Sequence, residues 1–210
     1  GNDAVRGVGY KMPGVMASAC GNLPAMSFTG TEALEISGDT LPTGDLTAFL
    51  VFRAGEEPEN DTNVLLSTDS LNYFSVYLYG KGQTFATAVQ TGRISMNILS
   101  NTLLDTEWHI LALTWSGEDI ENACMTQFMD GSHDDVKYCI REDAAIASKE
   151  ANRFTVGSGF TGEIGSVLIW NRALSDTEVA ETGLALAETY GLSWSGVGTR
   201  EPEPAGEAPT

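Results

Sequence analysis

Residues 162–191 read GEIGSVLIWNRALSDTEVAETGLALAETYG, and this stretch decides the fold. Residues 164–170 are apolar or small and rich in β-branched side chains, a composition typical of a half-buried strand. Ser175 stands three residues before Glu178, which is the spacing of a capping box at the start of a helix. Apolar residues then recur on one helical face, at Val179, Leu186 and Tyr190. Gly191 can end the helix with positive φ, so the stretch predicts one strand, a turn and one short helix.

Outward from this stretch, short segments of strand composition alternate with turn residues such as Gly, Asp, Asn and Pro. We expect about twelve strands. They lie at residues 25–28, 33–37, 46–53, 63–67, 73–79, 84–90, 93–99, 109–115, 123–129, 135–140, 154–157 and 162–170. Regularly spaced short strands with a single helix at the end favour an all-β, two-sheet antiparallel sandwich.

The chain has 210 residues, of which 42% are hydrophobic and 23 are Gly, so it suits one all-β domain with many turns. Its longest apolar runs are too short to cross a bilayer, which argues against membrane insertion. Residues 1–22 have no clear periodicity and predict an extended N-terminal arm before a sandwich at residues 23–194. Residues 195–210 are rich in Pro and Glu, as is typical of an acidic tail or linker.

The net charge is −18, from 29 acidic and 11 basic residues. Such a surface repels phosphate backbones and argues against nucleic acid as a partner. Solubility in salty surroundings explains the acidity, and an acidic face that binds a partner is the alternative. Carboxylates suited to Ca²⁺ are abundant, which keeps calcium open as a cofactor, but no EF-hand spacing arranges them. The metal-binding residues therefore stay unknown.

The opening stretch also carries a resemblance. The residues that match in order are Gly162, Ile164, Val167, Ile169, Trp170, Asn171, Arg172, Ala173, Leu174 and Ser175. They resemble the last strand and turn of LamG-like jelly-roll domains in the concanavalin A-like lectin/glucanase superfamily. Residues 23–36 (LPAMSFTGTEALEI) and 108–117 (WHILALTWSG) are similar to the opening strand pair and the central strand of that family. The resemblance implies a concanavalin A-like jelly roll with one short C-terminal helix.

Cys124 and Cys139 flank a segment that has turn residues at its middle, which predicts a hairpin. If the turn is centred near residues 131–132, the two cysteines face each other across the strands and can form a disulfide. This bridge implies an oxidising compartment, whereas the alternative is two reduced core thiols. Cys20 is left over, either as a buried free thiol or as a partner for another chain or segment.

The strand at residues 72–79 offers the candidate binding surface. Alternation places Phe74, Val76 and Leu78 on a core-like face. The opposite face carries the candidate ligand-binding residues, which are Tyr73, Ser75, Tyr77 and Tyr79. Tyrosine rings stack on sugar C–H faces while their hydroxyls form hydrogen bonds, and the resemblance implies that a concave sheet presents such a surface. The alternative is that these tyrosines pack under a loop or against another subunit.

Other conspicuous residues favour structural roles. Alternation in its strand places Trp115 in the core, and Trp170 should point away from the inter-sheet core, toward the helix or an edge loop. The Arg172 guanidinium, at the junction of strand and helix, can bond several carbonyls or a carboxylate at once. Ser175 and Glu178 form the predicted cap.

An enzyme would need reactive groups that the sequence does not display. Glycoside hydrolysis usually needs two carboxylates across the scissile bond, and the Glu-x-Asp-x-x-Glu pattern of retaining glucanases in this superfamily is not found. Glu32 and Glu35 are three residues apart and so face opposite sides of a strand. His109 and His133 have no convincing nucleophile nearby in sequence. We therefore predict no catalytic residues, with a glycoside hydrolase or lyase as a minor alternative.

Together these patterns predict a non-catalytic recognition module that binds carbohydrate or a glycoconjugate at a cell, matrix or virion surface. The alternative is a structural or interaction protein, such as a surface or virion decoration subunit, with protein partners in an assembly. Either function suits an extracellular, cell-surface or virion-surface location.

Overall fold

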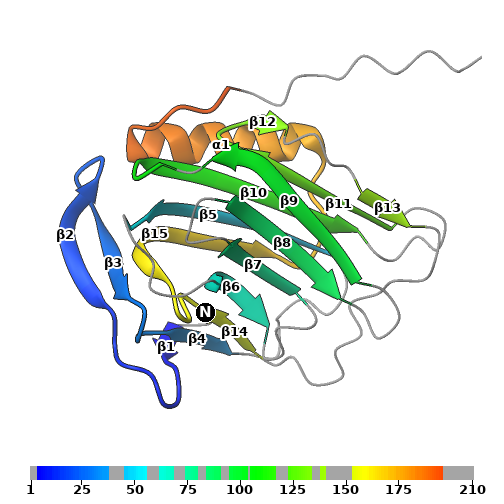
Figure 1. The fold of residues 1–210 in the computed structure, drawn as a ribbon. Helices are drawn as coiled ribbons and strands as arrows, with labels where there is room; N and C mark the ends of the chain where they lie inside the picture. The colour runs from blue at the N-terminus through cyan, green and yellow to red at the C-terminus, as the bar shows by residue number, and fades with distance from the viewer. Residues whose placement is uncertain are drawn as a thin grey trace, which may run out of the picture.

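The computed structural model describes residues 4–37, 45–55, 62–68, 74–79, 84–90, 95–103, 105–116, 123–133, 138–140 and 153–195. Within them the chain forms two antiparallel sheets, with one helix packed on the outer side of the second (Figure 1). This is the two-sheet sandwich that the regular spacing of short strands predicts, so the predicted fold class is confirmed.

The described strands fall into a seven-stranded and an eight-stranded sheet. In spatial order the seven are β1 (Ala4–Arg6), β4 (Leu34–Ser37), β14 (Arg153–Val156), β6 (Thr62–Thr68), β7 (Phe74–Tyr79), β8 (Thr84–Gln90) and β9 (Ser95–Leu103). The second sheet runs β12 (Ser132–His133), β11 (Ala123–Met129), β10 (Trp108–Ser116), β5 (Leu46–Ala54), β15 (Thr161–Trp170), β3 (Leu23–Thr29) and β2 (Gly14–Cys20). Its eighth strand, β13 (Tyr138–Ile140), pairs with β11.

The central strand β5 is buried on both faces. Leu46, Leu50 and Phe52 point into the core between the sheets. Phe49 and Val51 face the other way, into a second apolar cluster under the helix. Because both faces are covered, the strand is a nearly continuous apolar run instead of an alternating one.

Two tryptophans lie on opposite faces of this sheet. Trp115 is fully buried in the inter-sheet core, where alternation predicts it. Trp170 packs in the second cluster, and its ring meets Phe49 edge-on at 5.6 Å between centroids. Trp170 is therefore covered from the side of the helix.

The single helix among the described residues, α1 (Asp176–Tyr190), is capped at both ends. The Ser175 hydroxyl accepts a hydrogen bond from the Glu178 N–H, and the Glu178 carboxylate accepts one from the Ser175 N–H at 2.9 Å. Gly191 ends the helix in the left-handed region, at φ 67°, and donates its N–H to the Ala187 carbonyl. The helix thus stops where the chain must turn back over the sheet.

Arg172 links the end of β15 to the helix cap. Its guanidinium donates two hydrogen bonds to the Glu178 carboxylate, at 2.9 and 2.6 Å. These bonds, with those from Ser175, lower the pKa of Glu178 to about 2. The Arg172 carbonyl accepts a hydrogen bond from the Thr47 hydroxyl at 3.0 Å, which ties the turn to β5. The arginine therefore contacts only groups of the scaffold within the described part of the chain.

The extended N-terminal segment that we predict at residues 1–22 contributes two strands to the sheets. β1 pairs with β4, and β2 pairs with β3 at an edge of the eight-stranded sheet. Most of β2 is exposed, so it has no apolar alternation from which a strand could be predicted. Residues 196–210 of the predicted tail lie outside the described residues.

The predicted cysteine hairpin has its turn at Asp130 and Gly131, one residue earlier than expected. Both have positive φ, at 51° and 82°, as a two-residue type I′ turn requires. The register then shifts between β12 and β13, and Cys124 is the cross-strand partner of Cys139. The disulfide stays a prediction, because the side chains of these two cysteines lie outside the described part of the structure.

Candidate functional site

The outer face of the seven-stranded sheet carries the residues that the sequence singles out on β7. Phe74, Val76 and Leu78 lie in the inter-sheet core, so Ser75 and Tyr77 point outward. Ser75 is 2% exposed and Tyr77 is half-buried. Tyr73 and the side chain of Tyr79 lie outside the described residues. Two of the four candidate residues can therefore be placed, side by side on one face.

Strand register extends this surface into a row of polar residues. Ser75 is the partner of Ser67 on β6, Ser67 of Thr155 on β14, and Thr155 of Glu35 on β4. Because cross-strand partners point to the same side of a sheet, all four face outward. We call Glu35, Thr155, Ser67 and Ser75 the polar row. Sequence inspection misses three of them, since register between strands so distant in the chain leaves no local signal.

The two serines of the polar row are recessed. Ser67 is 3% exposed, and among the described residues neither its hydroxyl nor that of Ser75 forms a side-chain hydrogen bond. A hydroxyl can both donate and accept, so each retains hydrogen-bonding capacity for a ligand. The row therefore forms a polar floor between the half-buried ring of Tyr77 and the Glu35 end.

A charged pair closes that end of the row. Arg153 lies two residues before Thr155 on β14 and so faces the same side. Its guanidinium is 3.4 Å from the Glu35 carboxylate, which also accepts a hydrogen bond from the Val8 N–H at 3.2 Å. Arg153 remains 43% exposed, so this end presents a cation toward solvent.

The carboxylates described near this face do not form a hydrolytic pair. Glu35 is the single outward carboxylate among the described side chains of the sheet, and it is paired with Arg153. Glu32 is buried in the turn after β3, and burial by itself would raise the pKa of this carboxyl. Hydrogen bonds from Thr29 and Thr31 have a larger effect than burial and lower the pKa of Glu32 to about 2. A carboxyl with so low a pKa cannot serve as a general acid at neutral pH.

His109 likewise has a structural environment. Its Nδ1 is 2.8 Å from Asp130 Oδ2 and its Nε2 is 3.1 Å from Asp105 Oδ1. The side chain of His133 lies outside the described part of the chain.

No group of three or more potential metal ligands occurs within the described ranges, so they locate no calcium site. The one helix described is also not long and apolar enough to span a membrane.

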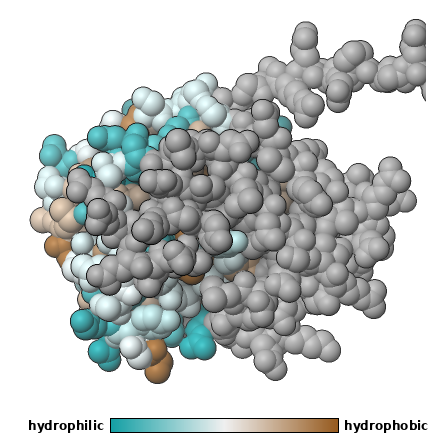
Figure 2. All heavy atoms as spheres, in the orientation of Figure 1, coloured by the Kyte–Doolittle hydropathy of each residue, from teal (hydrophilic) through white to brown (hydrophobic). Residues whose placement is uncertain are grey.

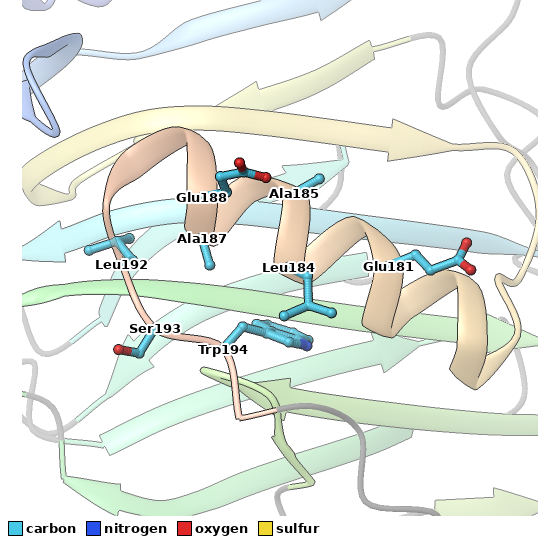
Figure 3. A pocket seen from close by; sticks show the side chains of 8 residues that line it. All are labelled: Glu181, Leu184, Ala185, Ala187, Glu188, Leu192, Ser193 and Trp194. Carbon is cyan, nitrogen blue, oxygen red and sulfur yellow. The ribbon is translucent and has the colours of Figure 1, made fainter.

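A concave surface lies beside α1 (Figure 3). Its lining residues are Glu181, Leu184, Ala185, Ala187, Glu188, Leu192, Ser193 and Trp194. Leu184 is 52% exposed, and the indole of Trp194 is buried beneath it. Trp194 Nε1 has no hydrogen-bond partner among the described residues, but it is shielded from the groove surface. This groove offers mostly apolar contact, so we place the candidate site on the outer face of the seven-stranded sheet.

These features define a jelly-roll sandwich with a polar outer face. A family model of the concanavalin A-like lectin/glucanases superfamily matches residues 28–180, and the chain belongs to this superfamily. The match confirms the resemblance carried by residues 162–175. No curated protein matches the chain by sequence.

Solved structures share the fold at low sequence identity. One is botulinum neurotoxin type C, whose cell entry depends on interaction with two ganglioside molecules; it has a TM-score of 0.66 and 9% identity, over 88% of this chain and 46% of that one. The binding domain of botulinum neurotoxin DC in complex with SialylT has a TM-score of 0.64 and 9% identity, over 91% and 49%. The binding domain of Paraclostridial Mosquitocidal Protein 1 has a TM-score of 0.60 and 10% identity, over 88% and 48%. The chain thus spans about half the length of these structures.

Proposed function

We propose that this chain is a non-catalytic recognition module that binds carbohydrate, as part of a glycoconjugate, at the outer face of the seven-stranded sheet. The observation that carries the proposal is the pair of recessed hydroxyls, Ser67 and Ser75, beside the half-buried ring of Tyr77. The structural neighbours include proteins that interact with gangliosides or SialylT, which supports the same class of ligand. The proposed setting is extracellular, at a cell or virion surface.

The chemistry of the face suits a sugar. A sugar ring is apolar on its C–H faces and polar at its rim, so it can stack on Tyr77 while its hydroxyls bond the polar floor. Arg153 adds a donor at the end of the row, where it can meet a hydroxyl or an acidic group. Binding of this kind needs no proton transfer.

The test is a glycan array probed with the full chain, once with calcium and once with a chelator, followed by titration of a bound glycan. Tyr77→Ala should weaken binding at least about fivefold, because an aromatic contact contributes about 1 kcal/mol or more. Leu184→Ala is the matched control, since Leu184 is an exposed apolar residue on the helix of the other sheet. Absence of any bound glycan in both conditions contradicts the proposal, as does equal binding by Tyr77→Ala.

The alternative function is a structural or interaction protein, such as a decoration subunit of a surface or virion. The observation that favours it is the group of exposed apolar side chains within residues 5–16. One neighbour is a neurotoxin binding domain in complex with rat synaptotagmin II, which supports a protein partner in such a fold. A protein that binds no glycan but forms a defined assembly in a mass measurement supports this alternative.

A glycan-degrading enzyme is the third candidate. A reducing-end assay with the glycans of the array tests it directly. Release of new reducing ends by the wild-type protein would show that it degrades glycans, and would contradict the non-catalytic function proposed above.

A further inference from the structure

Exposed apolar side chains gather in one short part of the chain. Of the seven large apolar residues that are exposed among the described residues, six lie within twelve positions: Val5, Val8, Tyr10, Met12, Val15 and Met16. The seventh is Leu184 on α1. In Figure 2, brown atoms stand at the left and lower rim, on the side where Figure 1 draws β2 and the connection from β1. A cluster of this kind marks an interaction surface.

The same part of the chain has no acidic residue. Residues 4–31 contain no Asp or Glu and carry Arg6 and Lys11, although the whole chain has 29 acidic and 11 basic residues. Two copies of a molecule with a net charge of −18 repel each other over most of their surfaces. A contact through β2, which has no charged side chain of its own, therefore avoids placing like charges on that strand opposite each other.

The backbone at this surface is an open sheet edge. The strand order of the eight-stranded sheet ends at β2, whose partner among the described residues is β3. β2 reads GVMASAC, with no charge and no Pro to block pairing. A register shift between Met16 and Cys20 bends its second half, so Gly14, Val15 and Met16 are its regular part. Val15 there is 71% exposed.

We propose that two copies of this chain associate through β2, paired antiparallel across a two-fold axis, so that the eight-stranded sheets join edge to edge. A two-fold contact places one surface against itself, which suits an apolar and acid-free segment. A bilayer is a poorer occupant, because hydrocarbon cannot satisfy the N–H and C=O groups of an open edge.

Charge along β2 also fits a second copy. Lys11 stands just before the start of β2. The other end of β2 lies at the C-terminus of α1, where Cys20 Sγ donates to the Tyr190 carbonyl at 3.5 Å. Antiparallel pairing brings Lys11 of one copy toward this helix end in the other. The last turn of α1 has no basic residue and contains Glu188, so the lysine meets a negative helix end.

Pairing through β2 does not involve Ser67, Ser75 or Tyr77, because β6 and β7 lie in the other sheet. Each dimer then presents two copies of the proposed glycan site. Linked sites raise the avidity for a surface that displays many glycans, without any new contact to the sugar.

Sedimentation equilibrium of the full chain tests the proposal, with hydrogen exchange measured at low and high protein concentration. We expect a species of twice the 22.4 kDa chain mass, and amides of β2 that become protected as it forms. Val15→Lys should raise the dissociation constant at least about tenfold, because a charge on an edge strand opposes pairing. Leu184→Lys is the matched control, and it should leave the dimer unchanged.

Three outcomes overturn the proposal. The first is a monomer at all concentrations up to about 100 μM, a range in which a micromolar complex is assembled. The second is a dimer that Val15→Lys leaves intact or that forms without protection of β2. The third is a monomer that sediments with phosphatidylcholine–phosphatidylserine vesicles, which assigns the apolar segment to a membrane surface. Each result is independent of whether the array finds a glycan.

Discussion

The indole of Trp194 lies against the backbone of Gly183, in the space where any other residue would carry its Cβ. A Cβ built on Gly183 would overlap the atoms of the indole ring. On its other side the indole packs against Phe49, with the two ring centroids 6.2 Å apart. Glycine in the middle of a helix is therefore explained by the ring that closes the second apolar cluster.

Gly183→Ala should destabilise the protein, although alanine is the better helix former by about 1 kcal/mol. The ring cannot retreat from the added methyl, because Phe49 supports it from the other side. Overpacking of a core costs roughly 1–3 kcal/mol, so we expect a net loss of about 1 kcal/mol in urea unfolding. In a Trp194→Leu background the same change should be neutral or stabilising. An equal loss in both backgrounds would show that the clash is not the cause.

Arg172 and Ser175 should affect stability and leave glycan binding unchanged. Ser175→Ala removes the N-cap and should cost about 1 kcal/mol of unfolding free energy. Arg172→Ala removes the bidentate contact with Glu178 and should lower the melting temperature by a smaller amount, because the pair is exposed. Melting curves and glycan titrations of both variants check this. An Arg172→Ala variant with normal melting but lost glycan binding would move Arg172 into the binding site.

His109 should make stability fall as pH rises. The hydrogen bond with Asp130, followed by that with Asp105, raises the pKa of His109 above 6.5 in spite of its partial burial. A pKa that is higher in the folded state gives a contribution that is complete below the unfolded value of about 6.5 and is lost as pH rises through the folded value. Urea midpoints between about pH 5.5 and 8.5 should therefore decline, and His109→Gln should flatten this decline. His133→Gln is the control, and a slope that follows His133 instead contradicts the assignment.

Glu32 should have the opposite pH dependence. Its pKa of about 2 lies below the ordinary value of 4.5, so its contribution is complete above pH 4.5 and is lost as pH falls toward 2. Glu32→Gln should lower stability at pH 7 by on the order of 2–3 kcal/mol, because the amide leaves some donors of Thr29 and Thr31 poorly satisfied. The difference between the two proteins should shrink below pH 4. A difference that is constant from pH 7 to 3 would mean that the charge of Glu32 does not stabilise the turn.

Central strands can be predicted from the sequence, whereas edge strands cannot. β5 and β10 carry long apolar or alternating runs because they are covered by neighbours, and their predicted bounds lie within one residue of those observed. β1 and β2 lie at sheet edges, where a strand is held by backbone bonds and its side chains meet water. Their composition therefore shows no alternation of apolar and polar residues from which a strand could be predicted.

The candidate site was predictable only within one strand. Alternation in β7 is sufficient to place Ser75 and Tyr77 on the outer face. Their neighbours depend on strand order, because β14 lies between β4 and β6 although it is far from both in the chain. No local pattern reveals that Thr155 stands beside Ser67. Long-range pairing of this kind is decided by packing of the whole sandwich.

Cys124 and Cys139 should form a disulfide, since they are cross-strand partners on β11 and β13. Alkylation in denaturant without reductant should then modify one of the three cysteines, which is Cys20, a buried residue without a disulfide. Reduction should expose all three and lower stability by about 3 kcal/mol, because a loop of this size is no longer closed in the unfolded chain. Cys124→Ser with Cys139→Ser is the control, and its stability should be insensitive to reductant. Three alkyl groups without reductant would show that the hairpin is held by strand pairing alone.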